Sequence, residues 1–250
     1  DGGDRSEACV SRFISEFGYR AYRRPLAGDE SQGMLGLFRA ANGEWGFEKG
    51  VELVLQAFLQ SPQFLYRTES LADSNAGRVG NGSVVLDSYQ VASRLSYFLW
   101  NTMPDAELFA LADAGQLTST EVVRAQAERM LDDERARQTV ADFHEQWLGL
   151  AQFAGLTRVV PDTDVTNGLN ASWADSLAQF VQHTFWDEGG NVEALLASPS
   201  VFVDAPLAAL YGVEPGEHRD GNRAGILTQP GLMALLAHAD QSAPVQRGKF

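Results

Sequence analysis

The feature that most constrains this chain is a series of apolar stripes at helical spacing, each bounded by residues that start or stop helices. Near the beginning, apolar residues recur every four positions from Cys9 to Ala21, between a candidate N-cap at Ser6 and a stop at Pro25. Residues three or four apart share one face of an α-helix, so this pattern predicts a helix with a buried stripe. No segment alternates apolar and polar residues as a half-buried strand would. The sequence therefore predicts an all-α fold, an irregular bundle of roughly ten helices that could form two packed helical subdomains.

Capping signals indicate where several of these helices begin. Asp87 with Gln90, and Thr118 with Glu121, each match a capping box, the second being the strongest local signal in the chain. Pro104-Asp105 is typical of the first turn of another helix, since proline and acidic residues both favour that position. Further helices are predicted over about 29–41 up to a break at Asn42-Gly43, from Gly46 to Ser61, up to about Leu150, from an Asn170 cap to Gly189, and at 192–196, 205–211 and 230–237.

Charge and residue counts exclude several classes of protein. The formal net charge of -14 argues against a nucleic-acid partner, because a phosphate backbone requires a basic surface. No stretch reaches the roughly 18 apolar residues of a membrane-spanning helix. Cys9 is the single cysteine, which leaves no disulfide within the chain and favours a small buried side chain. The four histidines do not form a His-Glu-x-x-His or similar motif, so no metal site is predicted: they are His144, His183, His218 and His238.

Arginines beside apolar residues have two interpretations. The cluster Arg20, Arg23 and Arg24 could bind an anion, but interior arginines at a helix end more often bind carbonyl groups and acids. Arg94 lies among Leu95 and Phe98, for which we expect a dry interior. We interpret it as bracing a helix-to-helix corner, through Asp105, another acid or exposed carbonyls, and not as a catalytic group.

Two further features leave functional alternatives open. The C-terminal stretch carries His238, Asp240 and Arg247 in what we expect to be irregular backbone, either a functional loop or a solvated tail. The tryptophans favour core positions over an exposed binding platform; they are Trp45, Trp100, Trp147, Trp173 and Trp186.

Several motifs in a fixed order resemble a known series. They are YRAYRRPL, LQSPQFLYRTE, ASRLSYFLWNTMPD, ERMLDDERARQTVADFHEQWLGL, FVDAPLAALYGV and, at the end, RGKF. This series resembles the planctomycete-specific domains of unknown function, found in large exported bacterial proteins that often carry c-type haem motifs. The resemblance implies an N-terminal helical domain over 5–70, a central one over 84–212, and at 220–250 the start of a truncated, haem-associated third domain. The glycine-containing segment 71–83 is typical of the linker between the first two.

The resemblance also implies a function. In the family, the stretch corresponding to Arg247–Phe250 precedes a Cys-x-x-Cys-His haem-attachment motif, so we expect a fragment or processed chain that attaches no haem itself. We expect the helical body of an exported c-type haem protein with a redox or electron-transfer role, part of an oxidoreductase and located in the periplasm or outside the cell.

Haem c would lie on an adjoining segment, and the partners would be the remainder of the same polypeptide or other subunits of a haem-containing assembly. His238 is then the best candidate for an axial ligand or a nearby supporting residue, assisted by Asp240 and Arg247. The alternative is a non-catalytic helical scaffold or a binding module for a partner protein or glycan.

Overall fold

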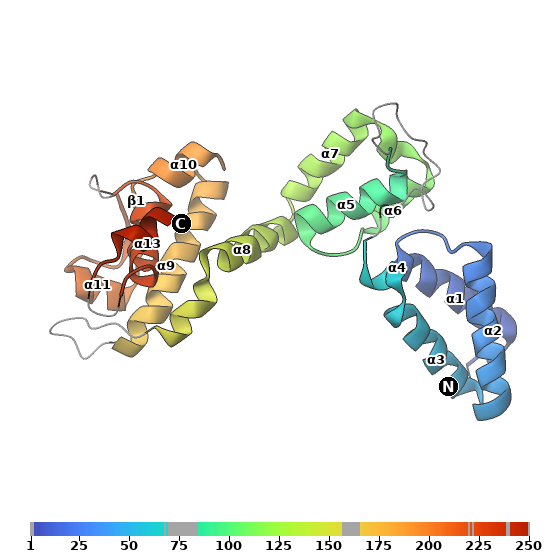
Figure 1. The fold of residues 1–250 in the computed structure, drawn as a ribbon. Helices are drawn as coiled ribbons and strands as arrows, with labels where there is room; N and C mark the ends of the chain where they lie inside the picture. The colour runs from blue at the N-terminus through green and yellow to red at the C-terminus, as the bar shows by residue number, and fades with distance from the viewer. Residues whose placement is uncertain are drawn as a thin grey trace. The chain divides into compact units, whose positions relative to one another are not determined.

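The computed structural model describes residues 3–67, 69, 85–156, 166–219, 221, 223–238 and 241–249. The chain divides into two compact units, Asp1–Arg135 (unit 1) and Ala136–Phe250 (unit 2), and each is described by itself (Figure 1). Helices make up most of the described residues, accompanied there by two short strands, which confirms the predicted all-α class. The expected linker at 71–83 lies outside the described residues, and the predicted domain boundaries stay predictions.

The first part of unit 1 is a small helical bundle around an aromatic core. Ser6 caps the first helix by accepting the backbone N–H of Cys9, as predicted. Val10 and Ile14 of this helix pack with the fully buried Phe58. Of the predicted stripe, Ala21 is buried, whereas Cys9, Phe13 and Phe17 are half-buried. The elements are α1 (Glu7–Tyr22), α2 (Gly28–Trp45), α3 (Phe47–Gln60) and α4 (Pro62–Leu65).

The break predicted at Asn42-Gly43 is wrong, because α2 continues to Trp45. An isolated glycine inside a helix costs only about 1 kcal/mol, which packing can offset. The helix ends instead at Gly46, whose φ of 90° suits a residue without a side chain.

In the second part of unit 1, the structure confirms one predicted capping box and corrects two other predicted helix starts. Asp87 and Gln90 form the predicted capping box. Thr118 lies in a 3-10 turn, and the neighbouring Ser119 caps the next helix, so the capping box predicted at Thr118 is wrong by one position. Asp105 is likewise an N-cap, which places Pro104 before the helix and not in its first turn. The elements are α5 (Ser88–Trp100), α6 (Ala106–Asp113), η1 (Gln116–Thr118) and α7 (Thr120–Leu131).

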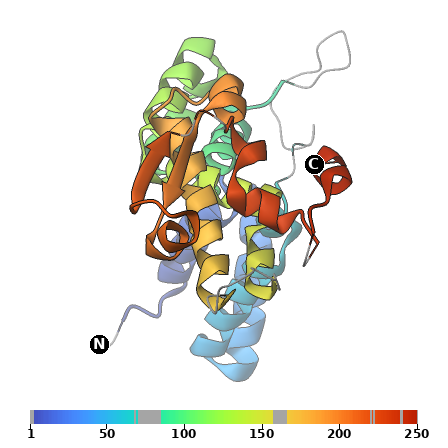
Figure 2. The same cartoon turned by 90° about the vertical axis from the view of Figure 1, so that its left-hand side faces the viewer.

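Unit 2 is built around the long helix α9, whose Leu177 and Phe180 are fully buried. A two-stranded antiparallel sheet, whose strands are separated along the chain by a short helix, lies against α9 (Figure 2). The Ser176 hydroxyl of α9 donates to the carbonyl of Phe202 in this sheet. The elements are α8 (Glu134–Leu148), which starts in unit 1, then η2 (Leu150–Gly155), α9 (Thr166–Trp186), α10 (Val192–Ala197), β1 (Ser200–Val203), α11 (Ala205–Tyr211), β2 (Gly216–Arg219), η3 (Ile226–Thr228), α12 (Pro230–Leu235) and α13 (Pro244–Lys249).

Two expectations for unit 2 are wrong. No strand was predicted here, yet β1 and β2 pair, because four residues in each strand are too few for a clear alternating pattern. Asn170 does not cap α9, which begins at Thr166; its side-chain amide donates instead to the carbonyl of Leu156 at 2.9 Å.

Candidate functional site

The three residues predicted to face a haem lie at the C-terminal end of unit 2. His238 is exposed in the turn after α12, and its backbone N–H donates to the carbonyl of Gln241 at 3.0 Å. Arg247 is half-buried on α13, so the irregular backbone predicted for it is wrong. Asp240 lies outside the described residues. Within the described part of the chain, no hydrogen bond joins the His238 and Arg247 side chains.

The histidine rings differ in their contacts. Nδ1 of His144 lies 2.7 Å from the carbonyl of Val140, and Nε2 of His218 lies 2.6 Å from that of Glu214. No described residue makes such a bond to the His238 ring.

The arginines at the end of α1 bind carbonyls and acids, as the favoured interpretation predicted. Arg23 is buried and donates to the carbonyls of Gln63 and Tyr66, at 2.6 and 3.1 Å. Arg24 forms a bidentate pair with Glu30, with both contacts at 2.9 Å. Arg20, in contrast, is exposed.

Arg94 pairs with a different acid from the one named first. Its Nε and Nη2 lie 2.9 and 2.5 Å from the two carboxylate oxygens of Glu69, and the Arg94 side chain is 62% exposed while that of Glu69 is 35% exposed. The expectation of another acid is therefore confirmed, and Asp105 as partner is wrong. Phe98 is 76% exposed, so the dry interior expected for it is also wrong.

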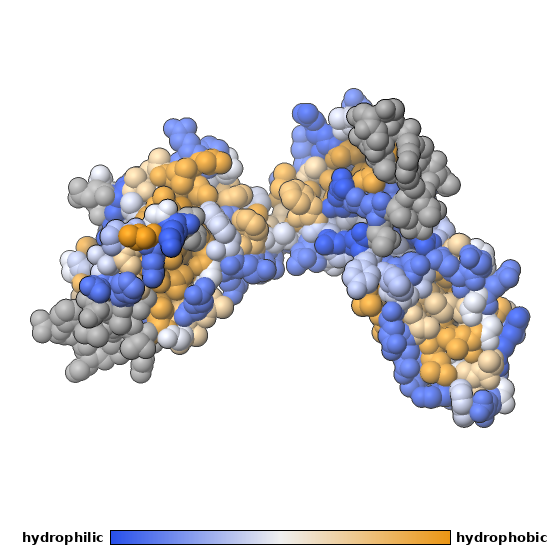
Figure 3. Space-filling model, in the orientation of Figure 1, coloured by the Kyte–Doolittle hydropathy of each residue, from blue (hydrophilic) through white to orange (hydrophobic). Residues whose placement is uncertain are grey.

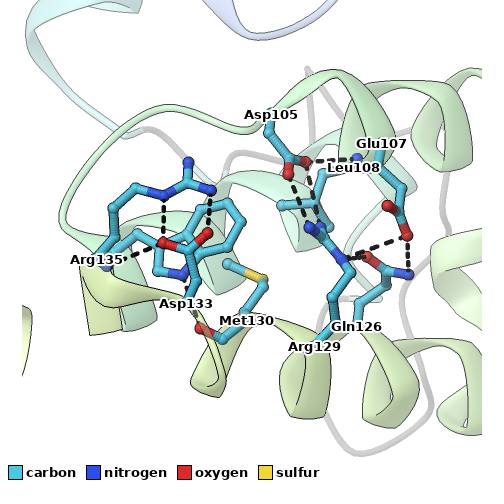
Figure 4. Close-up of polar contacts among 9 residues, drawn as sticks. Asp105, Glu107, Leu108, Gln126, Arg129, Met130, Asp133 and Arg135 are labelled. Carbon is cyan, nitrogen blue, oxygen red and sulfur yellow. Dashed lines mark hydrogen bonds and ion pairs between the residues drawn. The ribbon is translucent and has the colours of Figure 1, made fainter. Parts of the chain in front are cut away.

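Asp105 instead belongs to a polar network on α6 and α7 (Figure 4). Its carboxylate accepts the backbone N–H of Leu108 at 2.9 Å and binds the Arg129 guanidinium at 2.9 and 3.3 Å. Gln126 bridges Arg129 and Glu107, with both contacts at 2.8 Å. Burial acts to raise the pKa of Asp105, but its hydrogen bonds outweigh burial and hold that pKa below its ordinary value.

An arginine–tryptophan stack adjoins this network. The indole N–H of Trp100 donates to the carbonyl of Met130 at 2.8 Å, and the Arg135 guanidinium lies 3.4 Å from the centre of the indole ring. Arg135 in turn binds Asp133 at 2.7 Å. We interpret these contacts as structural, because each charged group has a partner within the fold.

A histidine cluster in unit 2 was missed by sequence reasoning. His183, in the last turn of α9, lies within 4 Å of three carboxylates, two of which contact the Arg219 guanidinium. The His183 cluster comprises His183, Asp187, Glu188, Glu217 and Arg219. The four-residue spacing of His183 and Asp187, at the end of a predicted helix, was the available signal. The β2 members could not be placed without the pairing of β1 and β2, which was not predicted.

The tryptophans divide between core and surface. Trp100 and Trp173 are buried as predicted, whereas Trp45 and Trp147 are 59% and 44% exposed, so the core prediction is wrong for these two. Trp147 stacks with Phe143, whose ring centre is 6.1 Å away. Apolar side chains reach the surface elsewhere on unit 2 as well (Figure 3), including Val192 on α10.

Three further properties concern metal binding, membrane crossing and the single thiol. Among the described residues, no group of three histidine, cysteine, aspartate or glutamate side chains is arranged to hold a metal ion. No helix of the described ranges is both long enough and apolar enough to cross a membrane. Cys9 is half-buried and carries a free thiol.

Comparison with known families shows where the chain belongs. The model of the family described as PSD4, Protein of unknown function (DUF1592), matches residues 86–213, more than half of the chain. The chain belongs to the DUF1592 family. The model of a second family, PSD5, Protein of unknown function (DUF1595), matches residues 9–69. No curated protein and no solved structure matches the chain.

Within unit 1, side chains tie the DUF1595 region to the DUF1592 region. The hydroxyls of Tyr19 and Tyr89 both donate to one carboxylate oxygen of Asp113, at 2.9 and 2.7 Å. Burial and the bond to Asp113 raise the pKa of Tyr89 to about 12, which keeps this phenol neutral. The Arg94–Glu69 pair spans the same two regions. These contacts join residues matched by the DUF1595 model to residues matched by the DUF1592 model, and we interpret them as structural.

Proposed function

We propose that this DUF1592 chain is the helical body of an exported, multidomain c-type haem protein with a redox or electron-transfer role. Its residues would bind the haem-carrying segment and position the haem. Haem c on that adjoining segment would supply the one-electron chemistry. Membership of the two domain families supports the proposal, because the ordered motifs resemble chains that carry such a segment. The partners would be the rest of the polypeptide or other subunits of a periplasmic or extracellular assembly.

The observation that carries the proposal is the state of His238. Its imidazole is exposed in a backbone turn held by Gln241, and none of the described residues hydrogen-bonds to the ring. It can therefore turn toward a group supplied from outside unit 2. Arg247, half-buried on α13, would add a positive charge near an anionic haem propionate.

The visible spectrum and reduction potential of the full-length, haem-loaded protein test this proposal. We expect His238→Ala to shift both, because exchange of an axial or neighbouring nitrogen changes the ligand field at iron. His218→Ala is the matched control, since the His218 ring is bound to the carbonyl of Glu214. An unchanged spectrum and potential in His238→Ala would remove the ligand role, and a full-length protein without covalent haem would contradict the redox role itself.

A non-catalytic binding module is the second candidate, favoured by the aromatic pair on α8. Phe143 is 59% exposed and Trp147 44%, and their rings are inclined by 27°. Exposed aromatic rings stack on sugars and on partner side chains. Titration of soluble oligosaccharides against intrinsic fluorescence tests the glycan form: Trp147→Ala should lose at least tenfold in affinity while Trp45→Ala keeps it. Absence of binding by the wild type would contradict that form.

A further inference from the structure

The short helix α4 and the residue after it present three consecutive large apolar side chains to solvent. Phe64 is 37% exposed, Leu65 58% and Tyr66 65%, and no residue of α4 is buried. Consecutive exposed apolar residues are unfavourable in water, and they are found where a partner covers them. This apolar run is therefore a candidate interaction surface.

A buried arginine holds the backbone under the apolar run. Arg23 is 7% exposed and donates to the carbonyls of Gln63 and Tyr66, at 2.6 and 3.1 Å. Its guanidinium also lies 5.7 Å from the centre of the Tyr97 ring on α5. A backbone fixed in this way presents its side chains to a partner without a further loss of entropy on binding. The apolar run is thus pre-organised while its side chains remain uncovered.

Phe98 extends the apolar surface onto α5. Its side chain is 76% exposed, and it lies one turn along the helix from Arg94. Arg94 binds Glu69, three residues beyond the apolar run, so this side of α5 lies beside the segment that follows α4. Aromatic and arginine side chains carry much of the binding energy in protein interfaces. The α4–α5 surface comprises Phe64, Leu65, Tyr66, Arg67 and Phe98.

Arg67 gives the α4–α5 surface a positive charge that the fold leaves available. Its guanidinium lies 4.7 Å from the centre of the Tyr97 ring, and none of the described carboxylates pairs with it. Arg39, another exposed arginine of unit 1, binds Glu7. The chain has 33 acidic residues and 19 basic ones, so carboxylates are not scarce. An exposed guanidinium beside uncovered aromatic rings can therefore take a carboxylate from outside the chain.

We propose that the α4–α5 surface is a docking site for an acidic segment of a partner protein that also carries aromatic side chains. A carboxylate of the partner binds the Arg67 guanidinium, and its apolar side chains cover Tyr66 and Phe98. The net charge of -14 does not prevent this, because salt screens charges beyond about 10 Å and the nearby cation dominates. The site is independent of the proposed redox role, whose residues belong to unit 2.

Fluorescence anisotropy of a labelled peptide that alternates glutamate with phenylalanine, titrated with the whole chain, tests the site. We expect saturable binding that half-molar salt weakens. Arg67→Gln should weaken it roughly three- to fivefold, the size of one exposed ion pair. Phe98→Ser should weaken it roughly tenfold, because it removes a large apolar contact. Both side chains are exposed, so the two variants should keep the thermal midpoint of the wild type.

Two substitutions elsewhere in unit 1 are matched controls. Arg124 is exposed on α7 and, within the described ranges, forms no ion pair, and Trp45 is 59% exposed on α2. Arg124→Gln and Trp45→Ser should both bind the peptide as the wild type does. A peptide with glutamine in place of glutamate should lose most of the binding, because it offers no carboxylate to Arg67.

Three results would overturn the proposal. The first is no saturable binding of the acidic peptide, or equal binding of its glutamine counterpart. The second is a dimer in sedimentation velocity that Phe98→Ser abolishes, since a second copy of the chain would then occupy the surface. The third is binding of dextran sulfate that depends on Arg67 but not on Phe98, which would identify a polyanion site in place of a protein-docking site.

Discussion

The two units stabilise charged groups in different ways. In unit 1, Asp105 binds Arg129, a cation that keeps its proton at any pH at which the protein folds. In unit 2, Glu188 lies 3.3 Å from the His183 ring of α9 and 3.0 Å from the Arg219 guanidinium of β2. The pKa of both carboxyl groups is held below its ordinary value, but the contacts of Asp105 come from consecutive helices, whereas those of Glu188 also require strand β2. The difference teaches that one charged network follows from neighbouring elements of the chain and the other from the pairing of distant ones.

The largest expected effect is the loss of a buried phenylalanine side chain, and it should be similar in both units. Phe180 in unit 2 is fully buried, and Phe180→Ala should lower the free energy of unfolding by about 3–5 kcal/mol through lost burial and a cavity. Phe58→Ala in unit 1 is its counterpart. Urea denaturation should give the same loss of unfolding free energy at pH 5.5 and pH 8 for each variant. A marked pH dependence would contradict the attribution of this loss to apolar burial.

Asp105→Ala should have the next largest effect, because it removes an N-cap and leaves the Arg129 guanidinium without its main partner. We expect a loss of about 1–2 kcal/mol. Asp105→Asn keeps a capping oxygen and should lose less. Urea denaturation of the three proteins at neutral pH measures this, and equal losses for the two variants would show that the charge contributes nothing.

The stabilisation that Asp105 contributes should depend on pH in a direction set by its lowered pKa. Because the pKa of Asp105 is lowered in the folded state, its stabilisation is present above the ordinary carboxyl pKa and is lost as pH falls through the lowered value. The gap between wild type and Asp105→Ala should hence be constant from pH 5.5 to 8 and narrow only in stronger acid. Thermal midpoints across pH measure it, and narrowing already near neutrality would contradict the permanent-charge description.

Arg94→Ala should have the smallest effect, although sequence reasoning gave this residue a bracing role. Its pair with Glu69 is largely exposed, and such pairs contribute about 0–1 kcal/mol. Half-molar salt should reduce the difference from wild type further. Arg94→Lys is the control that retains charge. A loss above about 2 kcal/mol in the alanine variant would show that the pair is more than a surface contact.

Local signals determined how much of the fold was predictable. The helix starts at Ser6 and Asp87 follow from capping chemistry that acts within four residues. At Thr118, Ser119 offered an equivalent oxygen, and which one caps depends on the preceding 3-10 turn. The exposure of Phe98 depends on which side of α5 meets other elements, which periodicity alone does not determine.

The candidate sites depended still more on distant contacts. His238 and Arg247 were selected on residue type and resemblance, and their role as haem neighbours stays a proposal. Tyr19 and Asp113 are 94 positions apart, and the His183 cluster needs strand β2 beside α9. Such pairings arise from packing between elements, for which a single sequence carries little signal.

Calorimetric scans of the wild type, Asp105→Ala and Phe180→Ala across pH test the contrast between a charged network and a core contact most directly. We predict that the midpoint gap between wild type and Asp105→Ala is constant from pH 8 to 5.5 and narrows in stronger acid, whereas the Phe180→Ala gap does not narrow with it. Gaps that narrow in parallel, or an Asp105→Ala gap that does not narrow in strong acid, would contradict this account.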